Sequence, residues 1–249
     1  MAMKAILSDI HANLEALDAV LDDMAEFDIE AIYCLGDTVG YGPDPGECLD
    51  ISMHFQVALL GNHEEAARSG PVGFTAEATV AAEWTRRQIQ IVRAEGDDPK
   101  LRRRFLERLK ATHEEGDFLF VHGSPRNPTE EYIYPESVND PGKLWDIFRK
   151  VRRYCFMGHT HIPGIFIEGF KFYTPDQLND VWALDGRKML CNVGSVGQPR
   201  DGDRRACYVL LDKKRVHFRR VPYDVKTTIK KIQQVPELRH TLHHYNYQQ

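Results

Sequence analysis

Apolar residues form short runs that alternate with amphipathic segments over the first quarter of the chain. Residues 4–8 and 31–35 are apolar runs of strand length, and residues 14–26 between them carry apolar positions at helical spacing. A third run, residues 55–60, follows a turn-rich stretch and a short helix predicted at 47–52. This rhythm predicts βαβ units, in which neighbouring strands are parallel.

The pattern changes twice further along the chain. Residues 75–110 are polar with helical spacing and are interrupted at 96–99, which predicts two helices packed on the outside or covering a cleft. Strands are predicted at 118–121 and 154–157, with a helix at 142–149 between them. Beyond Gly164 the β-rich segments are joined by turns without long helices, and they predict a second sheet. These segments are residues 165–167, 188–192, 206–211 and 216–221.

Length and composition favour one soluble domain. The chain of 249 residues is 42% hydrophobic, so we expect a single α/β domain over residues 1–249, with a helical, cap-like insertion at about 66–116. No apolar run approaches the ~20 residues that span a bilayer, and no secretory signal pattern is present. The sequence therefore predicts a cytoplasmic protein without a membrane partner. Residues 240–249, which include His243 and His244, are expected to be a frayed terminus and not a metal site.

Charge and cysteine content narrow the function classes. The formal net charge is −5, whereas dedicated nucleic-acid binders usually carry a basic face, so long duplex nucleic acid is excluded as the main substrate. The five cysteines are odd in number and include no C-x-x-C pair. We expect them to be reduced residues of the core.

Five short motifs with oxygen or imidazole donors follow five of the predicted strands. Ligands bind at strand ends in open α/β sheets, so side chains far apart in the sequence are expected to converge there. Taken singly, each motif has a structural explanation as a helix cap, a turn or a buried histidine. Five of the eleven histidines occupy these positions, which makes independent coincidence improbable. The motifs are Asp9-Ile10-His11, Gly36-Asp37, Gly61-Asn62-His63-Glu64, Val121-His122-Gly123 and Gly158-His159-Thr160-His161.

The donor set favours divalent metal ions. The donors are carboxylates, imidazoles and one amide oxygen, without a thiolate. Such a set is more typical of a site for divalent ions such as Mn, Fe, Zn or Ni than of a structural zinc site. Seven donors are too many for one tetrahedral zinc. Two ions about 3.5–4 Å apart, sharing a carboxylate, account for the number and match the arrangement used for displacement at phosphorus.

The five motifs, in this order, resemble the calcineurin-like metallophosphoesterases, whose blocks run D-x-H, G-D-x-x-(D/G), G-N-H-(E/D), an H block and G-H-x-H. The resemblance extends from residue 4 to about residue 220. It implies a two-sheet αββα sandwich with a helical insertion around 75–110 and two divalent metal ions at one rim. By position, it implies that Asp9, His11 and His161 bind one ion, that Asn62, His122 and His159 bind the other, and that Asp37 bridges them.

The resemblance also implies catalytic roles. A water or hydroxide shared by the ions is expected to attack phosphorus, with Asp37 and His63 as the catalytic residues. His63, beside Asn62, is expected to protonate the leaving oxygen or stabilise phosphate.

The second block departs from the serine/threonine protein phosphatases. Gly40 and Tyr41 stand where that branch has the Asp that orients the catalytic histidine and the Arg that holds phosphate, and Leu60 replaces a further Arg. The block is closer to the small bacterial and archaeal phosphodiesterase-like members. Residues 192–200 of this chain also resemble the glycine-rich loop of those members. Candidates for binding substrate phosphate are Arg200, Arg126 and Asn62.

These observations predict a hydrolase of small phosphodiesters or nucleotide-derived esters. Phosphomonoesters, phosphoproteins and dinucleoside polyphosphates are the alternative substrates, because the chemistry at the metals is common to all. A scaffold of the same fold that has lost its catalytic histidines is the alternative outside enzymes, and the intact donor set argues against it. Metal identity and oligomeric state stay open.

Overall fold

The structure is a computed structural model that describes residues 2–92 and 97–245, and the strands of this part of the chain form two mixed sheets. The first sheet has the order β3 (Val57–Ala58), β2 (Ile29–Cys34), β1 (Met3–Leu7), β11 (Ala206–Leu211), β12 (Arg215–Val221) and β9 (Val181–Ala183). The second has the order β4 (Thr112–Glu115), β5 (Phe118–Val121), β6 (Tyr154–Met157), β10 (Met189–Asn192), β7 (Gly164–Ile167) and β8 (Lys171–Tyr173).

Each sheet contains a parallel group of three adjacent strands. Strands β1, β2 and β3 are parallel in the first sheet, and β5, β6 and β10 are parallel in the second. The remaining strands pair antiparallel. The βαβ prediction is therefore confirmed. The predicted second sheet is present, but the β-rich second half does not form it alone. Strands β9, β11 and β12 complete the first sheet, whereas β7, β8 and β10 join β4, β5 and β6 in the second.

Alternating side chains place the core. On β1, Ile6 lies in the cluster between the sheets, whereas Ala5 and Leu7 pack on the outer side against α1 (Leu14–Met24). Both faces of this strand are covered, and its residues are apolar on both sides for that reason. Helix α1 begins after Asn13, whose side-chain oxygen accepts a hydrogen bond from the backbone N–H of Ala16. These layers form the αββα sandwich that the motifs predict.

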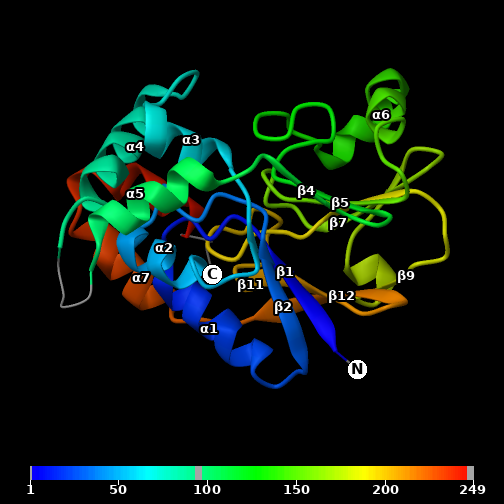
Figure 1. Cartoon of the computed structure of the whole chain (residues 1–249), viewed down its shortest axis with the longest axis horizontal. Coiled ribbons are helices and arrows are strands. Elements are labelled where there is room, and N and C mark those ends of the chain that lie inside the picture. Colours follow the sequence, from blue (N-terminus) through cyan, green and yellow to red (C-terminus); the bar gives the residue numbers. More distant parts are fainter. Residues whose placement is uncertain (1, 93–96, 246–249) are drawn as a thin grey trace.

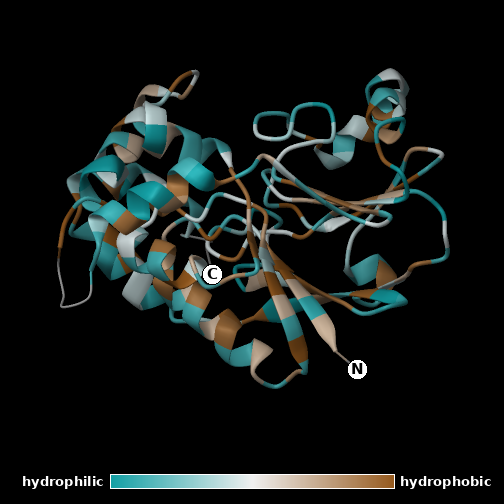
Figure 2. Cartoon of the chain, viewed as in Figure 1, coloured by the Kyte–Doolittle hydropathy of each residue, from teal (hydrophilic) through white to brown (hydrophobic). Residues whose placement is uncertain are grey.

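Helices cover the two outer faces unequally. Helix α6 (Pro141–Phe148) packs on the second sheet, and the other α-helices lie on the opposite side of the view in Figure 1. Teal and white dominate α3 to α5 in Figure 2, whereas brown runs along many of the strands. The predicted helix at 47–52 is α2 (Pro45–Ser52), and the two predicted at 75–110 are α4 (Ala76–Gln88) and α5 (Pro99–Arg108). Residue 96 of the predicted interruption lies outside the described residues. The unpredicted helices are α3 (Asn62–Ser69) and α7 (Val225–Gln233).

The C-terminal segment is ordered and packed, which corrects the prediction of a frayed terminus for residues 240–245. A 3-10 helix, η3 (Pro236–His244), lies against α4 and α7 and buries Leu238 and Tyr245. The hydroxyl of Thr241 donates to the carbonyl of Tyr41, 3.4 Å away, so this segment reaches the loop that follows β2. Residues 246–249 lie outside the described residues.

Burial of the cysteines agrees with the sequence-based expectation. All five cysteines are buried and free of disulfides, as predicted for core residues. Within residues 2–92 and 97–245, no helix combines the length and apolar character needed to cross a membrane.

Candidate metal centre

The seven donors lie at the carboxyl ends of the parallel strands. Asp9 and His11 follow β1, Asp37 follows β2 and Asn62 follows β3 in the first sheet. In the second sheet, donors follow β5 and β6. Because the sheets pack face to face, these ends meet at one rim of the sandwich. The donors from the second sheet are His122, His159 and His161.

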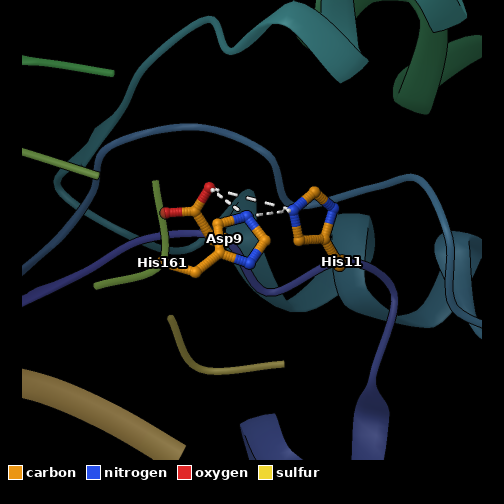
Figure 3. Close-up of side chains that lie close together, drawn as sticks. All are labelled: Asp9, His11 and His161. Atoms are coloured by element: carbon orange, nitrogen blue, oxygen red, sulfur yellow. Dashed lines mark hydrogen bonds and ion pairs between the residues drawn. The ribbon is translucent and has the colours of Figure 1, made fainter. Parts of the chain in front are cut away.

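One group of donors contains Asp9, His11 and His161. Their ligand atoms lie within 4.8 Å of one another. His161 Nε2 is 3.3 Å from Asp9 Oδ1 and 3.1 Å from His11 Nε2. In Figure 3 the three side chains point toward one another from two separate segments of the chain. All three are buried.

A second group contains Asp37, Asn62, His122 and His159. His122 Nε2 is 2.9 Å from His159 Nδ1 and 3.2 Å from Asn62 Oδ1. Asp37 Oδ2 lies 3.3 Å from His122 Nε2 and 3.7 Å from His11 Nε2. The carboxylate of Asp37 therefore faces a histidine of each group.

Hydrogen bonds on the outer side of three imidazoles orient their inner nitrogens. The Nδ1 atoms of His11 and His161 lie 3.2 Å from the carbonyl of Val39 and 2.6 Å from that of Gln198. A carbonyl only accepts, so each of these nitrogens carries the proton and donates. The Nε2 lone pair of each ring then faces the cluster, as metal ligation requires. His159 has the opposite arrangement, with Nε2 near the carbonyl of Glu130 and Nδ1 directed inward.

Each carboxylate is held by one oxygen and presents the other. Asp9 Oδ2 accepts the N–H of His159, and Asp37 Oδ1 accepts the N–H of His63, both at 3.0 Å. The remaining oxygen of Asp9, Oδ1, is buried and has no hydrogen-bond partner among the described residues. In this part of the chain no lysine or arginine forms an ion pair with Asp9 or Asp37. Buried charges need such compensation, and a divalent cation at the convergent donors would supply it. The residues therefore fit metal ions.

The pKa values reflect the same electrostatics. Burial lowers the pKa of His122, but the carboxylates of Asp37, Asp9 and Glu64, Asp37 first, together raise that pKa to about 9. Burial lowers the pKa of His159 to about 3. Burial raises the pKa of Asp37, and the neighbouring histidines, His122 first, reverse this and hold it well below its usual range. The ionised form of Asp37 is therefore favoured.

Glu64 positions the loops that carry the donors, and the motif analysis did not assign it a role. Its buried carboxylate accepts the backbone N–H groups of Asp37, Val39 and Gly61 at 2.7, 3.1 and 2.9 Å. The side chain of Glu64 is thus hydrogen-bonded to the loop after β2 and to the loop after β3. The sequence signal for this role is the position of Glu64, two residues after Asn62 and in the first turn of α3.

The backbone at the donors is strained and tightly packed. Five donors have a positive φ between 47° and 68°, a conformation that costs free energy for residues other than glycine. A Cβ atom on Gly61 would lie 2.1 Å from Asp37 Oδ1, and one on Gly158 would lie 2.4 Å from Asp9 Oδ2. These two glycines allow the carboxylates to approach the opposite loops. The strained donors are Asp9, His11, Asp37, His159 and His161.

His63 lies beside both groups, and its ring forms no ion pair with a carboxylate of the described residues. A ligand atom of His63 falls within 4.8 Å of those of His11 and Asp37. Its ring contacts Tyr41 at 4.4 Å between centroids, and its Nδ1 has no hydrogen-bond partner among the described residues. A Cβ on Gly40 would lie 2.1 Å from Nδ1, so Gly40 leaves the room that this ring occupies.

The two candidate arginines differ in position. Arg200 lies near the donors. Its guanidinium is 6.0 Å from the centre of the Tyr41 ring. Burial lowers the pKa of His161, and the charge of Arg200 lowers this pKa further. Arg126 is paired with Glu131 and lies 3.8 Å from Asp146, and none of its described interactions joins it to the seven donors. The geometry brings Arg200 to the site and gives no support to Arg126.

Comparisons with known proteins agree with this geometry. Residues 3–215 match the model of the calcineurin-like phosphoesterase superfamily domain. An uncharacterized protein of Methanocaldococcus jannaschii is 34% identical over 241 residues, which cover 93% of this chain and 92% of that protein. The crystal structure of a metallophosphoesterase from Sphaerobacter thermophilus is 34% identical, with a TM-score of 0.77 over 93% of each chain.

A more distant structure has the same fold. A hypothetical protein of Pyrococcus horikoshii is 20% identical, with a TM-score of 0.75 over 97% of this chain and 98% of that one.

The ordered motifs, the sandwich with its cluster of metal-binding residues and the match over most of the chain lead to one assignment. This chain belongs to the calcineurin-like phosphoesterase superfamily.

Proposed function

We propose that this protein hydrolyses small phosphodiesters or nucleotide-derived phosphate esters with two divalent metal ions. The observation that carries the proposal is the pair of donor groups that share Asp37, whose Oδ2 faces His11 on one side and His122 on the other. One group would hold an ion through Asp9, His11 and His161, and the other through Asn62, His122 and His159. Mn, Fe, Zn and Ni all suit these donors.

The ions, when bound, would lower the pKa of water and neutralise charge on the phosphoryl oxygens. The chain supplies the rest of the chemistry. Arg200 lies where a guanidinium could pair with a phosphoryl oxygen, and such charge-assisted hydrogen bonds are strong. His63 lies beside Asp37 and His11, where its imidazole could donate a proton to the leaving oxygen.

One further feature favours an enzyme over a scaffold, and another favours an intracellular location. All seven donors and His63 are present and buried together, which a purely structural role would not require. The five cysteines remain unpaired and buried, as is usual for proteins of the reducing cytoplasm.

Metal analysis tests the dinuclear site directly. We expect close to two transition-metal ions per chain after loading, because two donor groups converge around one shared carboxylate. Chelation should abolish hydrolysis and lower the melting temperature, since Asp9 and Asp37 would lose their compensating charge. Elemental analysis and thermal unfolding measure both effects. A reproducible content of zero or one ion with full activity would contradict the dinuclear proposal.

A substrate comparison tests the preference. We expect a higher kcat/KM on small phosphodiesters than on phosphopeptides, because Leu60 and Tyr41 occupy the positions of the arginines that hold phosphate in protein phosphatases. The comparison uses one metal-loaded preparation and includes phosphomonoesters and dinucleoside polyphosphates. A markedly higher kcat/KM on phosphopeptides would overturn the preference while leaving the metal site intact.

A further inference from the structure

Three aromatic rings form a stack that leads from the metal centre to solvent. The ring of Tyr132 lies on the imidazole of His159, with centroids 3.7 Å apart and planes inclined by 20°. The ring of Tyr134 stacks on Tyr132 at 5.3 Å with an interplanar angle of 5°. The stack therefore begins at a proposed metal ligand and ends at Tyr134.

The two tyrosines are exposed although their rings are large. Tyr132 is 39% and Tyr134 40% exposed, whereas Ile133 between them is 2% exposed and packs in the core with α6. In extended chain, successive side chains point to opposite sides, so burial of Ile133 directs both tyrosines outward. The amine of Lys143 donates to the carbonyl of Tyr132 at 2.6 Å, which further fixes this segment.

The stack begins at the site itself. Tyr132 lies directly on His159, one of the seven donors, and Tyr134 lies directly on Tyr132. A ligand group that rests on Tyr134 is therefore two rings away from a proposed metal ligand.

We propose that Tyr134 and Tyr132 form a stacking subsite for a nucleobase of the substrate. This inference rests on the proposed function, because it places the phosphoryl group at the seven donors. Any of the nucleobases can stack on an aromatic ring, and the sugar provides the spacer between base and phosphate. The proposed substrate is thus a nucleotide-derived ester. Tyr132 also covers His159, whereas Tyr134 touches no proposed metal ligand among its described ring contacts, so Tyr134 is the residue to vary.

Binding of two matched ligands tests the subsite. The ligands are the phosphonate analogues of adenosine 5′-monophosphate and ribose 5-phosphate, in which a methylene group replaces the ester oxygen so that neither is hydrolysed. They differ only at C1′, which carries adenine in one and a hydroxyl group in the other. Calorimetry on the metal-loaded protein should give a Kd about tenfold lower for the adenosine analogue, as expected for one base stacked on an aromatic side chain.

Variants separate stacking from other contributions. Tyr134→Ala and Tyr134→Leu should weaken binding of the adenosine analogue about tenfold and leave the ribose analogue unchanged. Tyr134→Phe keeps the ring and should retain the tenfold difference in Kd between the two analogues. Trp145→Ala removes another exposed aromatic side chain, 60% exposed on α6, and should also retain it. Metal content, measured on every variant, should be the same.

The outcomes distinguish the two proposals. If both analogues bind with equal affinity to the unchanged protein, or if Tyr134→Ala weakens both equally, the base subsite is wrong and the phosphate site stands. If neither analogue binds to protein that contains its metal ions, the proposed phosphate site fails and the base subsite fails with it.

Discussion

Replacement of Asp37 by asparagine should reduce metal content and turnover together, with turnover falling about 10³-fold or more. Within residues 2–92 and 97–245, Asp37 is the one carboxylate whose oxygen faces both donor groups, so its loss leaves two cations with less neutralising charge. Charge stabilisation of this kind contributes several kcal/mol, and each 1.4 kcal/mol is a tenfold change in rate. Asparagine keeps the shape and tolerates the positive φ of 54° at this position. Elemental analysis and steady-state kinetics measure the two effects.

Asp180 offers a matched control for this substitution. It is an exposed aspartate with a φ of 60°, so Asp180→Asn makes the same chemical change in the same backbone conformation. We expect unchanged metal content and rate. His11→Asn and His161→Asn should be less severe than Asp37→Asn, because each removes a donor from one group only. If Asp37→Asn retained both ions and near-normal turnover, the bridging role would be refuted.

Replacement of His63 by asparagine or alanine should preserve metal content and slow turnover by about 10²–10⁴-fold, the span for loss of a general acid or base. His63 lies within the cluster but is not one of the seven donors. Burial lowers its pKa to about 4, and the negative charge of a phosphoryl group beside the ring would raise it again. His54→Asn, at an exposed histidine, is the control and should leave the rate unchanged.

Leaving-group dependence identifies what His63 does. An aryl ester with an acidic phenol needs little protonation, so the His63 variants should be impaired less on it than on an alkyl or nucleoside ester. Equal losses on both esters would assign His63 to binding or positioning of phosphate. Loss of the metal ions together with the histidine would make it a structural part of the site.

The sequence predicts the donor cluster because the topology is simple where the donors lie. Each motif directly follows a strand, and parallel neighbours bring their carboxyl ends to the same edge, so adjacency in space follows from position in the chain. Glu64 shows the limit of this reasoning. Its place in the motif marks Glu64 for attention, but its contacts with Asp37 and Val39 depend on how the loop after β2 folds over α3, which the motif does not indicate.

The partition of strands between sheets was not predictable from periodicity. The segments of β10 and β11 are both apolar runs of strand length, yet one pairs with β6 and the other with β1. That choice depends on contacts between residues more than 30 positions apart. The stack of Tyr132 on His159 and the packing of the C-terminal segment near Tyr41 were also not predictable from periodicity, since each joins separate parts of the chain.

The positive φ values at five donors restrict what evolution can place there. Outside glycine, the left-handed conformation is tolerated best by asparagine, aspartate and histidine, which are themselves oxygen or nitrogen ligands. A single substitution at His11 or His161 can therefore exchange imidazole for carboxylate at little cost to the backbone. Exchange toward oxygen ligands would favour harder ions such as Mn. Within such a lineage, metal preference could drift by point substitution while the loops of the centre keep their conformation.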